Sequence, residues 1–207
     1  LFTLSDDKYD QVRRYIEMGG ADNLRGLLRW SCRELGGMSD LEVPEPRRPR
    51  TEGIYHPGHD LNIDLETYLG TLDPSRPTVG ILFPQGQWMS GDLAPIDALI
   101  HALDEIGANA LPVFFTSTPS EITGSKGIRK VVEEYLMEGS KPRVGAAIMA
   151  MGFSQLPLAN PGTGSTNVEV YNFFKDLNVP ILQVMTLWRT QAAWEENTFG
   201  LSAPEIS

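Results

Sequence analysis

Cysteine is nearly absent from this chain, since Cys32 is the only one among 207 residues. Two cysteines are needed for an intrachain disulfide and at least two for a Cys-based metal site, so both are excluded. A reducing compartment suits such a sequence, and we expect a cytoplasmic protein. Basic residues are also scarce, with 17 Lys and Arg against 27 Asp and Glu. The formal charge of -10 disfavours a nucleic-acid surface, because phosphates repel an acidic face.

Long apolar runs are missing as well. No stretch approaches the roughly 20 apolar residues that cross a bilayer, so we expect no membrane span. Residues 1–7 lack the basic start and the long apolar centre of a signal peptide. The chain does not begin with Met, which suggests a piece of a longer protein. Hydrophobic residues make up 41% of the sequence, and at this length they predict a globular protein with a sizeable core.

A short apolar run at residues 78–83 organises the second part of the chain. Its Val and Ile content and its flanking prolines favour a buried strand. A polar loop over residues 84–92 and an amphipathic helix over 93–106 are predicted next, with Asp92 as N-cap and Gly107 as the left-handed stop. Further strands, alternating with helices, are predicted at residues 109–115, 143–151 and 179–185. This alternation predicts parallel strands joined by right-handed crossovers.

The N-terminal part has a different pattern. We predict a helix over residues 9–18 and a second helix capped by Asp22, with one apolar face that we expect to be buried: Leu24, Leu27, Leu28, Cys32 and Leu35. Three prolines then mark residues 38–52 as a connector, in which solvated linker charges are favoured over an anion site for Arg47, Arg48 and Arg50. The predicted fold is therefore a helical, Pro-linked segment (residues 1–75) before an α/β domain (residues 76–207). That domain is expected to be a flavodoxin-like open parallel sheet flanked by helices, and it need not be complete at its C-terminus.

Residues 53–60 hold the densest group of ligand-type side chains. His56, His59 and Asp60 lie within a Gly/Pro turn and offer two imidazoles and a carboxylate to a divalent metal. The spacing has neither the helical i, i+4 geometry nor the paired cysteines of specific metal motifs. A structural turn, in which Tyr55 and His56 satisfy buried backbone groups, is therefore the alternative.

A second group of candidates follows the strand at residues 78–83. In a flavodoxin-like sheet, Gln85, Gln87, Trp88 and Ser90 face the long small-residue loop at residues 152–166 across the switch point between strands. Aromatic and amide side chains without a general base suit holding a conjugated or amide-bearing ligand, although a structural role for each stays open.

Nucleotide sites are disfavoured. Residues 124–126 read Gly-Ser-Lys but lack the rest of a P-loop, and no dinucleotide fingerprint follows a strand. His101, beside Asp97 and Asp104 or Glu105, either forms a relay or is a solvated residue of a helix face.

An ordered set of residues resembles the large subunit of the metal chelatases, the family of CobN of cobaltochelatase and the H subunit of magnesium chelatase. These residues span nearly the whole chain: Gly19-Gly20, Asn23-Leu24, Leu27-Leu28, 53–57, 76–82, Gly91, 96–100, Gly107, 111–114, 179–183, Trp194 and Gly200-Leu201. The CobN side of the family is the closer match.

The resemblance implies a subunit of an ATP-dependent ligase that forms nitrogen–metal bonds, inserting cobalt or magnesium as substrate into a corrin or porphyrin in cobalamin or chlorophyll biosynthesis. ATP would be used by separate AAA+ subunits and not bound here, and this piece alone would be inactive. His56 would ligate the metal or accept a proton, and His59 would assist as a weaker ligand. The tetrapyrrole would be contacted by Tyr55, Gln85, Gln87, Trp88, Ser90 and Arg189.

Two alternatives come from other classes of protein. The chain is either a structural or docking module that contacts the AAA+ subunits or later domains of its own subunit while chemistry occurs elsewhere, or an unrelated flavodoxin-like domain that binds a flavin or a B12-type cofactor.

Overall fold

The computed structural model describes residues 5–60, 63–151, 174–184 and 190–197, which divide into two compact units. The first unit contains residues 1–50 with 86–92, and the second contains residues 51–85 with 93–207. The sequence placed the boundary at residue 75. The division falls earlier because β1, Gly53–Ile54, pairs with the central sheet and carries residues 51–75 into the α/β unit.

The first unit is built on two helices, α1 at Asp6–Met18 and α2 at Gly20–Glu34. Gly19 joins them at a φ of 62°, a conformation that glycine adopts without steric cost. Gly19 is therefore the N-cap of α2, and the prediction of an Asp22 cap is wrong. Asp22 instead lies in the first turn of the helix, where its carboxylate pairs with Arg25 at 2.7 Å.

Most of the face of α2 that we predicted to be buried is exposed, and Leu27 is the one of its five residues that is half-buried. Leu24, Leu28 and Leu35 are 51%, 67% and 61% exposed, and Cys32 is also exposed. The buried residues of α2 are Asn23, Gly26 and Trp30. Gly26 explains the choice of face, because a Cβ there would lie 2.7 Å from Cε1 of Tyr15, so the missing side chain lets α1 approach closely.

The connector is fastened to the helical pair. Asn23 donates from its side-chain amide to the carbonyl of Arg47 at 2.6 Å and accepts from the Arg47 N–H at 2.9 Å. The Tyr15 hydroxyl donates to the carbonyl of Pro44. Residues 44–47 are thus held by specific hydrogen bonds to the two helices.

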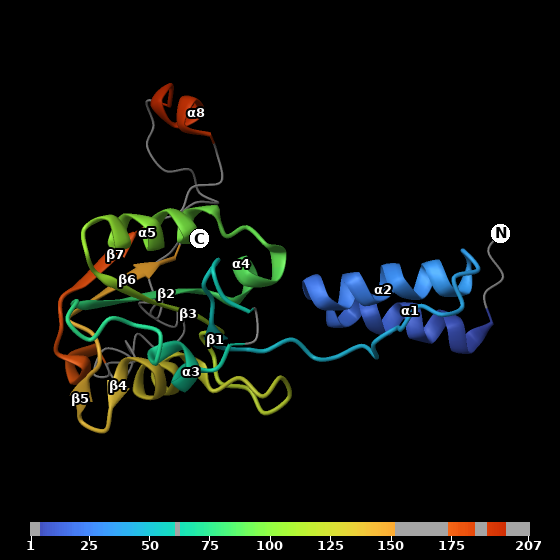
Figure 1. Ribbon diagram of the computed structural model, residues 1–207, viewed down its shortest axis with the longest axis horizontal. Coiled ribbons are helices and arrows are strands. Elements are labelled where there is room, and N and C mark those ends of the chain that lie inside the picture. The colour runs from blue at the N-terminus through green and yellow to red at the C-terminus, as the bar shows by residue number, and fades with distance from the viewer. Residues whose placement is uncertain (1–4, 61–62, 152–173, 185–189, 198–207) are drawn as a thin grey trace, which may run out of the picture. The chain divides into compact units, whose positions relative to one another are not determined.

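The second unit contains a five-stranded sheet in the order β1-β3-β2-β6-β7 (Figure 1). The strands besides β1 are β2 at Thr78–Pro84, β3 at Asn109–Phe115, β6 at Ala146–Ala150 and β7 at Ile181–Val184. All pairs are parallel except β1 with β3. The prediction of a mixed α/β fold with a mostly parallel sheet is confirmed. The parallel strands follow the spatial order second, first, third, fourth, with which a flavodoxin-like sheet begins.

Helices cover both faces of this sheet (Figure 1). One face carries α5, Ala94–Glu105, and the other carries α3, Leu65–Leu69, and α6, Gly127–Val131, which continues as a π-helical turn at Val132–Leu136. A two-stranded ribbon of β4, Met137–Glu138, and β5, Lys141–Pro142, follows. A short helix, α8, lies at Gln191–Glu195. No helix within the described ranges is long and apolar enough to cross a membrane.

The segment after β2 differs from the prediction. The expected loop over residues 84–92 contains a helix, α4, at Gln85–Ser90. Gly91 ends it at a φ of 75°, and the N–H of Asp92 donates back to the Gln87 carbonyl at 3.1 Å. Asp92 therefore belongs to the end of α4 and does not cap α5, whose N-cap is Leu93. The predicted left-handed stop at Gly107 is confirmed by its φ of 76°.

Candidate functional site

The Tyr-His-Pro segment leaves the edge strand β1 as a tight turn. The Tyr55 N–H donates to the Pro112 carbonyl of β3 at 3.1 Å, which continues the antiparallel pairing for one residue. The His59 N–H then donates to the His56 carbonyl at 3.1 Å and closes the turn. His56 is therefore held at a fixed position beside the edge of the sheet.

The imidazole of His56 is half-buried in an aromatic cluster. Its ring centroid lies 5.0 Å from that of His59 and 5.8 Å from that of Tyr68, and the Gly58 N–H donates to its Nδ1 at 3.1 Å. Burial lowers the pKa of His56, and the neighbouring His59 and His101 lower it further. His56 is consequently neutral at pH 7.

Tyr55, which precedes His56, is buried. It is 6% exposed, its ring meets Phe83 edge-on at 6.2 Å, and its hydroxyl donates to Oδ1 of Asp97 at 2.7 Å. Burial raises the pKa of Tyr55 to about 12, and the hydrogen bond to Asp97 and the charge of that carboxylate act in the same direction. The phenol therefore stays protonated and ties the segment before His56 to α5.

Helix α5 brings further titratable groups to His56. Asp97, His101 and Asp104 follow one another at spacings of four and three, so they share one helix face, and each acts electrostatically on His56. All three histidines of the chain thus lie in one neighbourhood. Asp104 is paired with Arg76 at 2.9 Å.

Within the described residues, the side chains around His56 do not form a group of metal ligands. Among the residues that the structure describes, no group of three or more His, Cys, Asp or Glu side chains is arranged to hold a metal ion. The sequence-predicted pair of His56 and His59 therefore lacks a third protein ligand in the described part of the chain. The rings of His56 and His59 meet edge to face, with an interplanar angle of 67°.

The second predicted group is divided between the two units. Gln85 belongs to the α/β unit, at the carboxyl end of β2, where its Oε1 accepts from the Thr116 hydroxyl at 3.2 Å. Gln87, Trp88 and Ser90 belong to the helical unit. Arg189 and the loop at residues 152–166 lie outside the described residues.

Two of these side chains in the helical unit are informative. The Ser90 hydroxyl donates to the Gln87 carbonyl at 3.2 Å, so it serves the end of α4. The side-chain oxygen of Gln87 is buried and has no hydrogen-bond partner in the part of the chain that the structure describes. An unpaired buried acceptor is costly, which makes Gln87 the stronger candidate for meeting a donor on a ligand.

The direction of β1 separates His56 from the carboxyl edge of the sheet. Gly53 lies opposite Phe114 and Ile54 opposite Val113, so the chain runs from the carboxyl end of β3 toward its amino end. His56 therefore lies beside the middle of the sheet edge, whereas Gln85 lies at the carboxyl end of β2. The two groups of candidates do not converge on one crevice within the α/β unit.

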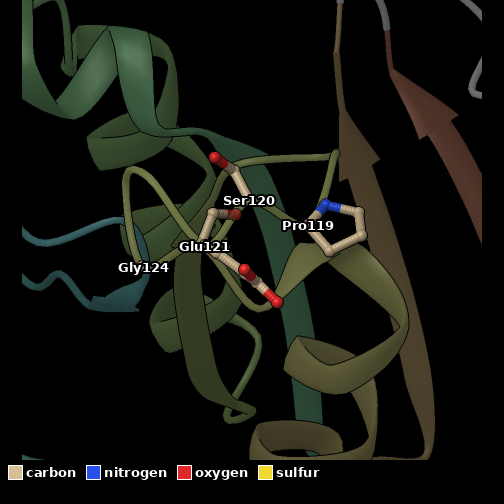
Figure 2. A pocket seen from close by; sticks show the side chains of 5 residues that line it. Pro119, Ser120, Glu121 and Gly124 are labelled. Carbon is tan, nitrogen blue, oxygen red and sulfur yellow. The ribbon is translucent and has the colours of Figure 1, made fainter.

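A hollow of about 310 Å³ lies in the loop between β3 and α6 (Figure 2). It is lined by Pro119, Ser120, Glu121, Gly124 and Ser125. Ser125 is buried, and its hydroxyl donates to the Thr118 carbonyl at 2.9 Å, while Lys126 pairs with Glu134 at 2.6 Å. Both side chains are therefore engaged in contacts within the described part of the chain.

The family model described as CobN/Magnesium Chelatase matches residues 13–207. The chain belongs to the CobN/magnesium chelatase family. This identifies the family that the ordered residue set in the sequence resembled.

Relatives occur on both branches of the family. The chain is 26% identical to the aerobic cobaltochelatase subunit CobN of Sinorhizobium sp over 99% of its own length and 15% of that protein. It is 25% identical to the chloroplastic magnesium-chelatase subunit ChlH of Oryza sativa subsp. indica, over 99% of the chain and 16% of that protein. An uncharacterized protein of Methanocaldococcus jannaschii is 27% identical over 99% of the chain and 16% of its own length. The chain thus spans about one sixth of the length of these relatives.

A solved structure shares the fold. The catalytic subunit of cobaltochelatase from Mycobacterium tuberculosis superposes with a TM-score of 0.63 at 23% identity, over 94% of this chain and 15% of that one. This likeness supports the α/β architecture described above.

Sequence reasoning missed the residues that hold His56 in place. Gly58 supplies a backbone N–H to its ring, and Asp97 anchors the preceding Tyr55 through a contact 42 residues away. The spacing of Asp97, His101 and Asp104 on one helix face was a usable signal. The antiparallel edge strand, which brings that face to His56, was not predicted.

Proposed function

We propose that this chain is part of the tetrapyrrole-binding large subunit of a metal chelatase, of the cobaltochelatase type, that inserts cobalt or magnesium into a corrin or porphyrin. Membership in the CobN/magnesium chelatase family supports the proposal. The metal is a substrate of this reaction. ATP hydrolysis is assigned to AAA+ partner subunits, since neither the sequence nor the loop at residues 124–126 provides a P-loop.

The observation that carries the proposal for this segment is the neutral, half-buried imidazole of His56. It is held by Gly58 on one side and by aromatic rings on another, and its Nε2 makes no hydrogen bond to any described residue. Pre-positioned polar groups on an otherwise apolar surface are typical of ligand sites. We propose that His56 faces the macrocycle.

The remaining candidates are proposed as contacts separately within each unit, with Gln87 and Trp88 in the helical unit and Gln85 in the α/β unit. Trp88 supplies a ring surface that suits stacking on a conjugated macrocycle, and Gln87 supplies an acceptor for an N–H or O–H of the ligand. Gln85, held by Thr116, and Arg189 are proposed to bind polar substituents of the ring.

A docking role is the second candidate, and a separate observation favours it. The leucine face of α2, formed by Leu24, Leu28 and Leu35, is exposed although its periodicity is that of a buried helix face. Apolar side chains gathered on a surface often mark a protein interface. In this alternative the segment contacts AAA+ subunits or other parts of a chelatase, and chemistry takes place elsewhere.

An absorbance and fluorescence titration of the chain with a metal-free corrinoid and a metal-free porphyrin tests the first proposal. We expect binding that His56→Ala or Trp88→Ala weakens at least tenfold, which corresponds to about 1.4 kcal/mol. His101→Ala is the matched control, because His101 is an exposed histidine near the same site. Absence of binding to both macrocycles would refute this role and favour docking.

A further inference from the structure

The hydrogen bond from Gly58 to His56 determines which ring nitrogen carries a proton. A neutral imidazole has one N–H and one nitrogen with a lone pair. Because the Gly58 N–H donates to Nδ1 at 3.1 Å, Nδ1 is the acceptor. The proton of the neutral ring is therefore on Nε2.

Packing around the imidazole of His56 restricts the ring rotation that would interchange the positions of Nδ1 and Nε2. A Cβ on Gly58 would lie 3.3 Å from Nδ1 and 3.5 Å from Cε1, so the imidazole packs directly on the glycine backbone. Another side of the ring is covered by His59 at 5.0 Å and by Tyr68 at 5.8 Å. Tyr68 is itself fixed, since it is 1% exposed and its hydroxyl donates to the Ala110 carbonyl at 2.8 Å.

We propose that His56 is a hydrogen-bond donor that receives an oxygen acceptor of the ligand, through Nε2–H, and that it is neither a metal ligand nor a proton acceptor. Both excluded roles need a lone pair, and the only lone pair of the ring is used by Gly58. The acceptor is a carboxylate or an amide carbonyl at the edge of the ligand. The identity of the ligand rests on the proposed function, whereas the proton position is a property of the free protein.

The surroundings of His56 are compatible with an oxygen acceptor. Two carboxylates lie near it, but Asp97 accepts from Tyr55 at 2.7 Å and Asp104 is paired with Arg76 at 2.9 Å. The negative charge of each carboxylate is therefore already stabilised by a hydrogen-bond donor of the protein. A neutral N–H donor also recognises an oxygen without adding a positive charge.

The proton position is measured directly by nitrogen-15 NMR of the imidazoles in the free 207-residue chain. With three histidines in the sequence, the spectrum is assigned by His56→Gln, His59→Gln and His101→Gln variants. We expect a pyrrole-type shift at Nε2 of His56 and a pyridine-type shift at Nδ1. The reverse pattern would overturn the proposal, and so would a selective shift of His56 on addition of Zn²⁺ alone.

A second experiment measures the binding of two ligands, a metal-free porphyrin with free carboxylic acid side chains and the methyl ester of the same porphyrin. We expect His56→Ala to weaken porphyrin binding at least tenfold and His56→Gln, which keeps an N–H donor, to weaken it less than about threefold. Equal losses in both variants would overturn the donor role. Weaker binding of the ester identifies a carboxylate as the acceptor, and equal binding of the ester identifies a carbonyl.

Gly58→Ala provides an independent variant that leaves His56 in place. Its Cβ displaces the imidazole, so we expect a mixture of the two proton positions in the NMR spectrum together with weaker porphyrin binding. An unchanged spectrum would show that Gly58 does not fix the ring. Failure of every macrocycle to bind would refute the proposed function, while the NMR result on the free protein would remain decisive for the proton position.

Discussion

The hydrogen bond between Tyr55 and Asp97 offers a quantitative test of how the candidate site is held. Tyr55→Phe removes the hydroxyl and keeps the ring, including its edge-on contact with Phe83. A hydrogen bond to a charged group contributes about 1.5–3 kcal/mol. Because Asp97 is only half-buried and regains water when Tyr55 is changed, we expect the lower end of that range, about 1.5 kcal/mol.

A double-mutant cycle isolates this contact. Asp97→Ala also removes an acidic residue from the first turn of α5, where a negative charge stabilises the helix by about 0.3–1 kcal/mol. The stability loss of this single variant therefore does not measure the hydrogen bond alone. The coupling between Tyr55→Phe and Asp97→Ala excludes that contribution. We expect a coupling of about 1–2 kcal/mol in urea-induced unfolding followed by circular dichroism.

A second cycle is the matched control. Tyr68 lies in the same neighbourhood, but its hydroxyl donates to the Ala110 carbonyl and not to Asp97. Tyr68→Phe combined with Asp97→Ala should therefore show a coupling close to zero. A Tyr55 coupling below about 0.5 kcal/mol, or one equal to the Tyr68 coupling, would refute the view that Asp97 anchors the segment before His56.

Three further predictions concern the fold around the site. Gly127→Ala should destabilise the chain by about 3 kcal/mol in urea unfolding and Gly124→Ala by about 1 kcal/mol. Both glycines have a φ near +76°, so the backbone strain of an alanine is similar at the two positions. A Cβ on Gly127 would in addition lie 2.8 Å from Pro119, whereas a Cβ on Gly124 would enter open space. Equal losses of stability in the two variants would therefore contradict this packing. The pKa of Tyr55 should be about 12 when its ionisation is followed by the absorbance of the phenolate. Because this pKa is raised above the ordinary value of 10, the contribution of the protonated Tyr55 to stability should be complete below pH 10 and be lost between pH 10 and 12. Phenolate formation by Tyr55 near pH 10 would contradict the burial of this residue. Cys32 should react with a thiol reagent under native conditions nearly as fast as in urea, and strong protection would show that the leucine face of α2 is covered.

Much of the architecture follows from local sequence pattern. The strand at residues 109–115 is found at the predicted positions, because a nearly continuous apolar run is typical of a parallel strand that is buried on both faces, as this one is. The helices α1 and α2 follow from their apolar periodicity and from Gly19. The family resemblance also lay in the order of short motifs along the chain, which folding does not change.

Tertiary structure decided the details that local pattern leaves open. Periodicity marked the leucines of α2 as an apolar face, but the close approach of Tyr15 to Gly26 selected the opposite face for packing.

The sequence by itself identified His56 as the chemically distinctive residue. Only the fold supplied the Gly58 hydrogen bond, the aromatic neighbours and the Tyr55–Asp97 anchor that define what its ring can do. The physical reason is that composition fixes which groups are available, whereas burial and hydrogen-bond partners fix their protonation and direction. Those partners come from residues as far as 42 positions away in the chain.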